Sequence, residues 1–176
     1  MLSHEYDYVL VSIGASNVEL VSSAQRFPAA MQDGEMQVIP GRWAHRFVNK
    51  SAEAAHLVMI ESRALIKPDA SLCGLSSERC HDMNFAKDAA GEYSQATMFE
   101  TPTMRLVKAE LGAGSILPKH EHGSDHLLVA LTRMDLIGDH EHIVRDPGEV
   151  FWHHQGFASL KNTGEEQTRF LLVELK

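Results

Sequence analysis

Three histidines in one short stretch of this 176-residue chain, His120, His122 and His126, are the residues best suited to chemistry. Successive side chains of a β-strand point to opposite faces, so His120 and His122 share one face. His126 shares that face if the strand continues without a bulge. Neutral imidazoles bind zinc, iron, nickel, copper or manganese, and three protein ligands with an open position are usual in catalytic metal sites. We therefore predict a divalent metal site here, and solvated histidines in a polar turn are the alternative interpretation.

Histidines are concentrated in the same region of the chain. Seven of the eleven histidines lie between residues 120 and 154. Two of them, in His140-Glu141-His142, are flanked by Asp139 and by Asp146-Pro147. Residues of this kind favour turns, so we expect an exposed turn at 140–142.

Composition and charge restrict the partners. The formal charge is −8, from 16 basic and 24 acidic residues, and no cluster of Lys and Arg suits a phosphate backbone or an anionic membrane. No apolar run is long enough to cross a bilayer, and the N-terminus lacks a basic region followed by an apolar core. We expect a cytoplasmic protein that binds neither nucleic acid nor membrane. Cys73 and Cys80 match no zinc or redox motif and are expected to be reduced thiols, with a local disulfide between them as the alternative.

Short apolar runs bounded by turn residues predict an all-β protein. The predicted strands are 8–13, 36–39, 56–60, 104–111, 127–131, 150–152 and 170–173. Between the third and fourth of these, residues 62–95 are polar and are broken by Pro68, Gly74 and Gly91. This stretch is interpreted mainly as a connection, with room for a short helix around residues 85–90.

The two halves of the chain repeat each other. Residues 7–13 align with 125–131, 34–36 with 148–150, 47–51 with 160–164, and 56–61 with 169–174. The agreement in order and spacing indicates a duplicated β unit. We predict an N-terminal unit at 1–62, a connection at 63–96 and a C-terminal unit at 97–176.

The motifs in these units resemble those of the cupin superfamily. Gly114-x5-His120-x-His122-x3-His126 resembles the first cupin motif, and Gly34 to Asn49, with Pro40-Gly41 and His45-x3-Asn49, resembles the second. Residues 148–164 form a poorer copy of the second motif. The resemblance covers most of the chain outside the connection and identifies a small bicupin. It implies an all-β fold of two double-stranded β-helix (jelly-roll) units, the N-terminal one incomplete.

In the family, a divalent metal is often held by His, His and Glu of the first motif and His of the second. The C-terminal copy departs from this set, because His126 stands where glutamate is usual. The second-motif histidine falls at Ala158 or Ser159 and is absent. His153 or His154 could replace it only if the backbone there is displaced.

The N-terminal copy has the opposite defect. It keeps His45, but its first motif begins at the chain start, where His4 corresponds to His122, Leu2 to His120 and Tyr8 to His126. The strands that should precede this motif are missing, through truncation or because the connection or a second subunit completes the barrel. Strand edges left in this way favour a partner chain, so we expect a homodimer.

Two functions follow from the resemblance, since cupins include dioxygenases, isomerases, epimerases, decarboxylases, seed storage proteins and sugar-binding regulator domains. The first is a metal-binding cupin that binds or acts on a small organic molecule, with zinc, iron, manganese or nickel in the C-terminal barrel. An enzyme of this kind would be of dioxygenase or isomerase type. The second is a non-catalytic cupin that binds a small ligand or dimerises, with a degenerate metal site. The predicted metal ligands are His120, His122 and His126, with weaker candidates His154, His4 and His45.

Overall fold

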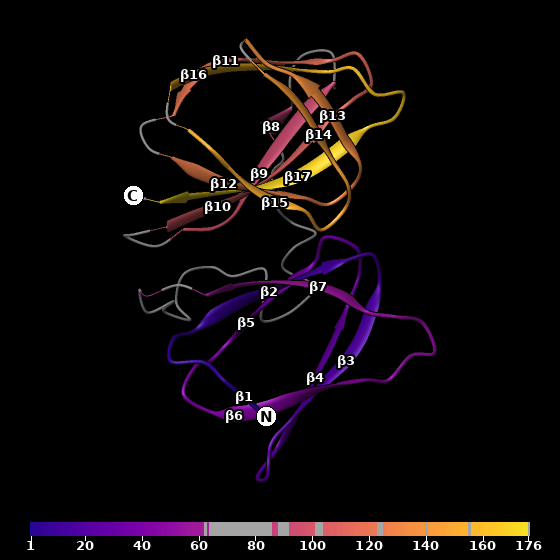
Figure 1. The fold of residues 1–176 in the computed structure, drawn as a ribbon, viewed down its shortest axis with the longest axis vertical. Coiled ribbons are helices and arrows are strands. Elements are labelled where there is room, and N and C mark those ends of the chain that lie inside the picture. The colour runs from indigo at the N-terminus through magenta and orange to yellow at the C-terminus, as the bar shows by residue number, and fades with distance from the viewer. Residues whose placement is uncertain are drawn as a thin grey trace. The chain divides into compact units, whose positions relative to one another are not determined.

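The structure, a computed structural model, describes residues 1–61, 63, 86–87, 92–100, 104–122, 125–139, 141–154 and 156–175, with the backbone alone at 86–87, 99, 118–122 and 156–158. The regular elements in these ranges are β-strands, as predicted (Figure 1). In the same ranges no helix has the length and apolar character needed to cross a membrane. The chain divides into two compact units, Met1–His81 and Asp82–Lys176.

The N-terminal unit is a sandwich of a four-stranded and a three-stranded antiparallel sheet. The strand orders are β1-β6-β3-β4 and β5-β2-β7. The strands are β1 (Leu2–Ser3), β2 (Tyr8–Ile13), β3 (Ser16–Val21), β4 (Arg26–Met31), β5 (Met36–Ile39), β6 (Ala44–Asn49) and β7 (His56–Glu61). A core cluster that includes Tyr8, Leu10, Leu20 and Ile39 fills the space between the sheets.

The C-terminal unit has the same plan with more strands. Its six-stranded sheet has the order β15-β12-β17-β10-β9-β8, and its four-stranded sheet the order β11-β16-β13-β14. The strands are β8 (Ala86–Lys87), β9 (Tyr93–Glu100), β10 (Met104–Leu111), β11 (Ile116–His122), β12 (His126–Ala130), β13 (Met134–Ile137), β14 (His142–Arg145), β15 (Val150–His153), β16 (Gly156–Asn162) and β17 (Thr168–Leu175). Leu128, Leu136 and Phe170 belong to its core cluster.

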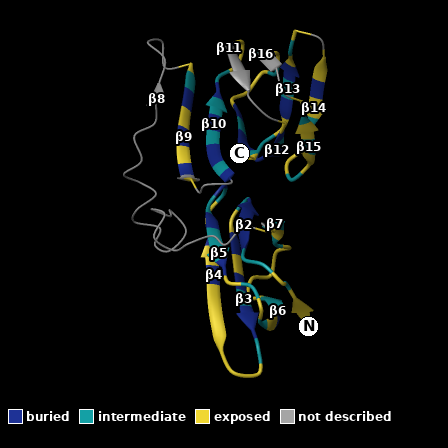
Figure 2. Cartoon of the chain, turned by 90° about the vertical axis from the view of Figure 1, so that its left-hand side faces the viewer, coloured by how far each residue is buried: buried dark blue, intermediate teal, exposed yellow. Residues whose placement is uncertain are grey.

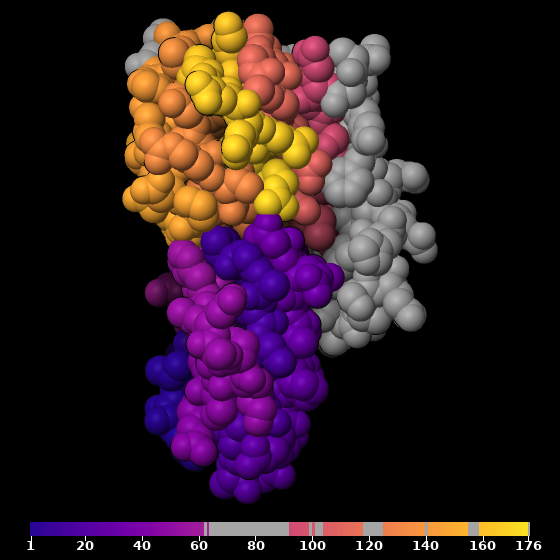
Figure 3. All heavy atoms as spheres, turned by 90° about the vertical axis from the view of Figure 1, so that its right-hand side faces the viewer, coloured from indigo at the N-terminus to yellow at the C-terminus, as the bar shows by residue number. Residues whose placement is uncertain are grey.

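Burial follows the position of each strand in its sheet. In Figure 2, β10 is mostly buried, whereas β4 and β9 carry many exposed residues. The space-filling view of Figure 3 shows the yellow C-terminal residues between the orange and salmon segments. This arrangement matches the pairing of β17 with both β12 and β10. The C-terminal unit therefore has its last strand in the middle of its larger sheet.

The two halves of the chain that repeat each other in sequence also form equivalent hydrogen bonds. Gly34 (φ 73°) and Gly148 (φ 88°) both adopt the left-handed conformation that favours glycine. The glutamate after each glycine accepts a backbone N–H three residues before it. The matching bonds are Gly34 N to Ser12 O and Gly148 N to Ala130 O, both 2.8 Å, then Gln32 N to Glu35 Oε2, 2.7 Å, and Asp146 N to Glu149 Oε2, 2.6 Å.

A second pair of equivalent residues, Asn49 and Asn162, closes the turn after β6 and after β16. Each Nδ2 donates to a carbonyl four residues later, at 2.6 Å for Asn49 and 2.8 Å for Asn162. Each Oδ1 accepts the N–H two residues later, at 3.0 Å in both units. Because the same two turns recur in the same order, the fold consists of two jelly-roll units, the N-terminal one with fewer strands.

Several observed strands, among them β3, β4 and β13, were not predicted from the sequence. The structure also differs from specific expectations at three places. Ala86–Lys87 forms the strand β8 where a short helix was considered, and the rest of 85–90 lies outside the described residues. β9 begins at Tyr93, inside the range 63–96 assigned to the connection. His142 is exposed as expected but begins β14, paired with Ile137, and is not in a turn. His140 lies outside the described residues.

Candidate functional site

The first cupin-like motif of the C-terminal unit is divided between two sheets. β11, which ends at His122, lies in the four-stranded sheet, whereas His126 begins β12 in the six-stranded sheet. The three histidines therefore do not lie on one uninterrupted strand, because β10, β11 and β12 alternate between the sheets of the jelly roll. In the backbone register His120 is opposite Ala158, and His122 is opposite Gly156. The side chains of His120 and His122 lie outside the described residues.

His126 faces the interior of the C-terminal barrel. It is 2% exposed, and it shares a strand face with Leu128 and Ala130 of the core cluster. Its cross-strand neighbours are His153 on β15 and Glu174 on β17. The rings of His126 and His153 have centroids 4.9 Å apart. Directly opposite residues of antiparallel strands share a face, so these three side chains line one side of the barrel.

The side chains of His153, His126 and Glu174 form a row across the sheet, and this row continues onto β10, where Arg105 is opposite Glu174. The Arg105 Nε–H donates to Glu174 Oε2 at 2.5 Å. This bond raises the pKa of Arg105, so the guanidinium stays protonated at neutral pH. At the other end of the row, His153 Nε2 lies 2.8 Å from Glu141 Oε1. The interior face of the six-stranded sheet thus carries His153, His126, Glu174 and Arg105 side by side on four neighbouring strands.

The second-motif position of the C-terminal unit is fixed by comparing registers. Leu2 is opposite His45 in the N-terminal unit, and the equivalent residue of the C-terminal unit, His120, is opposite Ala158. The counterpart of His45 is therefore Ala158, which has no ligand atom. His154 lies at the surface, with its side chain 85% exposed and its Nδ1 3.4 Å from Asp125 Oδ2.

The N-terminal barrel gathers its own polar cluster around His45, which is fully buried. The Tyr8 hydroxyl lies 2.8 Å from His45 Nε2, and His45 Nδ1 lies 3.2 Å from the Trp43 carbonyl. Burial raises the pKa of Tyr8, so its hydroxyl stays protonated and donates. His45 Nε2 therefore accepts and Nδ1–H donates to the carbonyl, a tautomer assigned from the hydrogen bonds. The Nε2 lone pair that a metal would need is taken by Tyr8.

The other first-motif remnant, His4, lies close to this pair. Its ring centroid is 4.7 Å from that of Tyr8 and 6.0 Å from that of His45. His4 Nδ1 lies 3.4 Å from Glu61 Oε2, and the Tyr6 N–H donates to Glu61 Oε1 at 3.2 Å. The Tyr6 bond, and then His4, lower the pKa of Glu61. The structure thus brings His4 and His45 together. The hydrogen-bond partner of His4 Nδ1 is Glu61, and that of His45 Nε2 is Tyr8.

Glu61 and Glu174 were not singled out as site residues from the sequence. In the structure they occupy equivalent positions, opposite Tyr8 and His126 respectively. The signal was present in the repeat, because both aligned runs 56–61 and 169–174 end in glutamate. In the ranges that the structure describes, no three His, Cys, Asp or Glu side chains are grouped closely enough to hold an ion. A metal centre in the C-terminal barrel therefore requires at least one ligand outside these described side chains, and His120 and His122 are the candidates from the sequence.

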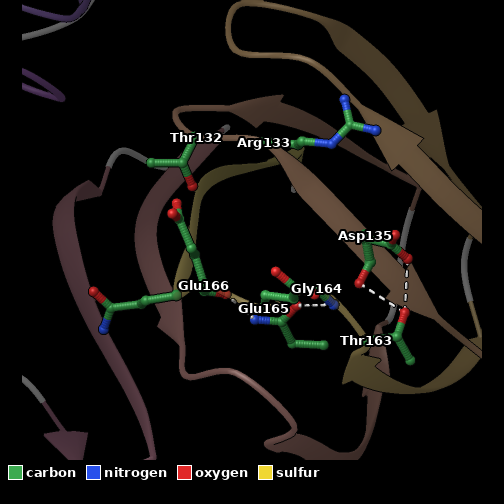
Figure 4. Close-up of a pocket in the computed structure, with 9 residues that line it drawn as sticks. Thr132, Arg133, Asp135, Thr163, Gly164, Glu165 and Glu166 are labelled. Carbon is green, nitrogen blue, oxygen red and sulfur yellow. Dashed lines mark hydrogen bonds between the residues drawn. The ribbon is translucent and has the colours of Figure 1, made fainter.

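A polar pocket of about 530 Å³ also occurs in the C-terminal unit (Figure 4). Asp135 accepts hydrogen bonds from Thr163 Oγ1 at 2.7 Å and from His142 Nε2 at 2.8 Å. The His142 bond, then the Thr163 bond, lower the pKa of Asp135. No sequence motif marks these turn residues. Since its central carboxylate is already engaged, the pocket offers less chemistry than the barrel interior.

No protein family model and no curated protein matches the chain. Several solved structures are similar to it. AerE from Microcystis aeruginosa has 12% identity and a TM-score of 0.70, covering 99% of this chain and 79% of its own. The putative glyoxylate induced protein from Pseudomonas aeruginosa has 15% identity and a TM-score of 0.69, covering 100% and 68%.

A third similar structure, the cupin 2 conserved barrel domain protein from Leptotrichia buccalis, has 13% identity and a TM-score of 0.58, covering 100% of this chain and 76% of its own. At these identities the similarity is one of fold. The sequence motifs, the two jelly-roll units and this similarity agree, and we conclude that the chain has the cupin fold.

Proposed function

We propose that this protein is a small bicupin that binds a divalent metal ion in its C-terminal barrel and there binds or acts on a small organic molecule. The observation that supports this most is the position of His126, which is buried on the interior face of the barrel beside His153. His126 follows the strand that carries His120 and His122 by four residues.

The residues present fit a metal ion by their chemistry. His120, His122 and His126 would supply three imidazole nitrogens, which suit zinc, iron, manganese or nickel. A bound ion supplies Lewis-acid catalysis, or a site of oxygen chemistry if it is iron. The surrounding core residues, among them Leu128 and Phe170, would keep the interior of the barrel apolar for an organic ligand.

Metal analysis of the purified protein tests this proposal. We expect about one divalent ion per chain in the wild type and none in the His120→Ala, His122→Ala double variant. His45→Ala is the matched control, because it removes an imidazole from the other barrel, and it should keep the ion. Equal metal in the wild type and the double variant would refute the site. Loss of the ion in His45→Ala would place it in the N-terminal barrel instead.

A second candidate function is a non-catalytic cupin that binds a small ligand or dimerises. Two observations favour it: Ala158 stands at the second-motif position of one barrel, and Tyr8 engages His45 in the other. A wild-type protein that stays metal-free after incubation with each candidate ion would support this function over the first.

We also propose a homodimer with its interface on the N-terminal unit. In the described residues β7 pairs with β2 on one side, whereas its counterpart β17 pairs on both sides, with β12 and β10. An open strand edge favours pairing with another chain, and a two-fold axis is the commonest oligomer symmetry. Light scattering over a range of concentrations should give twice the 19.6 kDa chain mass. A monomer at high concentration would refute the dimer.

A further inference from the structure

We propose that Glu174 is the fourth protein ligand of the ion in the C-terminal barrel and replaces the second-motif histidine that is absent at Ala158. This inference rests on the proposed function, since it concerns the same ion. It extends the ligand set to a strand that carries no cupin-like motif. The argument uses the strand register, the comparison of the two units and the charges along the row.

The register places Glu174 where a ligand is needed. Glu174 is directly opposite His126, and it shares a strand face with Phe170 and Leu172 of the core cluster. The Cβ atoms of directly opposite residues are about 4.5–5.5 Å apart, so a glutamate and a histidine at such positions can reach one ion. The Glu174 side chain is 19% exposed and lies mostly out of water.

The N-terminal unit shows how far the equivalent glutamate reaches. Glu61 is opposite Tyr8, as Glu174 is opposite His126. Its carboxylate lies 3.4 Å from Nδ1 of His4, the counterpart of His122. The glutamate at the end of β7 therefore reaches the one first-motif histidine that this unit keeps, His4. We expect the equivalent glutamate of the C-terminal unit, Glu174, to have the same reach from its position opposite His126.

The charges on the row favour a carboxylate ligand. Arg105 Nε–H donates to Oε2 of Glu174 and orients the carboxylate, and a carboxylate has about four lone-pair sites in all. Ionised carboxylates are the form that binds metal. Three imidazoles with one carboxylate suit zinc, iron and manganese.

His153, the other neighbour of His126, is the competing candidate. Its Nε2 lies 2.8 Å from Glu141 Oε1, so this nitrogen is engaged by a carboxylate of the chain. The counterpart of His153 in the N-terminal unit is Ile39, which is opposite Tyr8 and belongs to the core. The position of Glu174 thus carries a glutamate in both units, whereas the position of His153 is polar in the C-terminal unit alone.

Titration of the metal-free protein with Zn²⁺ against a chromogenic chelator tests the inference, with Co²⁺ absorption as a second readout of the ligand set. We expect Glu174→Gln, which has nearly the same shape, to weaken Zn²⁺ binding by more than about 100-fold, beyond the 10–100-fold typical of outer-shell partners. It should also change the visible Co²⁺ spectrum. Glu61→Gln is the matched control in the other barrel and should bind Zn²⁺ as the wild type does.

Two further variants separate the outcomes. Glu174→Asp keeps a carboxylate and should bind Zn²⁺ more tightly than Glu174→Gln. Because both variants change the same residue, a difference between them reports the carboxylate and not a small loss of stability. His153→Gln should weaken binding by less than Glu174→Gln. If the wild type binds Zn²⁺ but Glu174→Gln binds it within 3-fold, or if His153→Gln has the larger effect, the assignment of Glu174 is wrong and the metal site stands. If the wild type binds no ion, the proposed function fails first.

Discussion

Replacing Tyr8 with phenylalanine would remove one hydroxyl and leave a buried acceptor, His45 Nε2, without its donor. Tyr8 and His45 are both 0% exposed, and the bond between them is 2.8 Å long. An unsatisfied buried acceptor costs about 1–3 kcal/mol, and phenylalanine keeps the packing of the ring. The other tautomer gives no relief, because His45 would then lose its hydrogen bond to the Trp43 carbonyl. We therefore expect Tyr8→Phe to lower the free energy of unfolding of the N-terminal unit by about 1–3 kcal/mol.

The two tryptophans of the chain allow each unit to be followed separately. Trp43 stacks on His45 with ring centroids 4.4 Å apart, whereas Trp152 is 55% exposed and lies in the C-terminal unit. In a Trp152→Phe background, fluorescence reports on the N-terminal unit. For small proteins in urea the slope is about 1–3 kcal/mol per M, so the midpoint should fall by roughly 1 M.

A double-mutant cycle with His45→Leu tests the reasoning. Each single variant leaves one polar group buried without its partner, whereas the double variant leaves neither, so the two losses should not add. Coupling below about 0.5 kcal/mol would show that Tyr8 and His45 act independently and would refute the assigned hydrogen bond.

Three other perturbations follow from the structure. Asn162→Ala should lower the unfolding free energy of the C-terminal unit by about 1–3 kcal/mol, because three carbonyls lose a buried donor; an unchanged urea midpoint would contradict this. His142 lowers the pKa of Asp135 in the folded state, so this carboxylate stabilises the fold above its ordinary pKa of about 3.9, and the stabilisation is lost as the pH falls through the lower folded value. Asp135→Asn should flatten the fall in urea midpoint between about pH 4 and pH 2, and a slope equal to that of the wild type would disprove the linkage. Gly41→Ala would place a Cβ 2.4 Å from the backbone C and O of Tyr6, so it should lower the melting temperature of the N-terminal unit, and an unaltered temperature would mean that this approach is relaxed.

The strands that the sequence predicted with their observed bounds are those with an apolar run between turn residues. β2, β5 and β10 begin and end where the runs at 8–13, 36–39 and 104–111 do. β3 and β9 were missed because polar and apolar residues alternate along them. For β9 there was a second reason, since it begins within residues 62–95, whose polar content suggested a connection. A strand with one exposed face carries a weaker signal in a single sequence than a strand that is buried on both faces.

The sequence suggests the histidines of the candidate site but not their cross-strand neighbours. The spacing of His120, His122 and His126 is visible along the chain, and so is the loss of a second-motif histidine near Ala158. Glu174 and Arg105 lie 48 and 21 positions from His126 in the sequence. The order of the strands in the sheet places the three residues side by side. Cross-strand pairs of this kind become visible once the register is known.

The central place of β17 in its sheet has a consequence for the order in which the chain folds. β10 can pair with β9 and β12 with β15 before β17 is made, but the other edge of each strand stays open until β17 is available between them. During synthesis on the ribosome the N-terminal unit has all of its strands well before that point, whereas the C-terminal unit must wait with two long apolar strand edges open. Domains generally fold in the order of their synthesis, and late pairing between distant strands is slow and prone to aggregation. A chain arrested before residue 168 should therefore contain a folded N-terminal unit and a C-terminal unit that depends on chaperones.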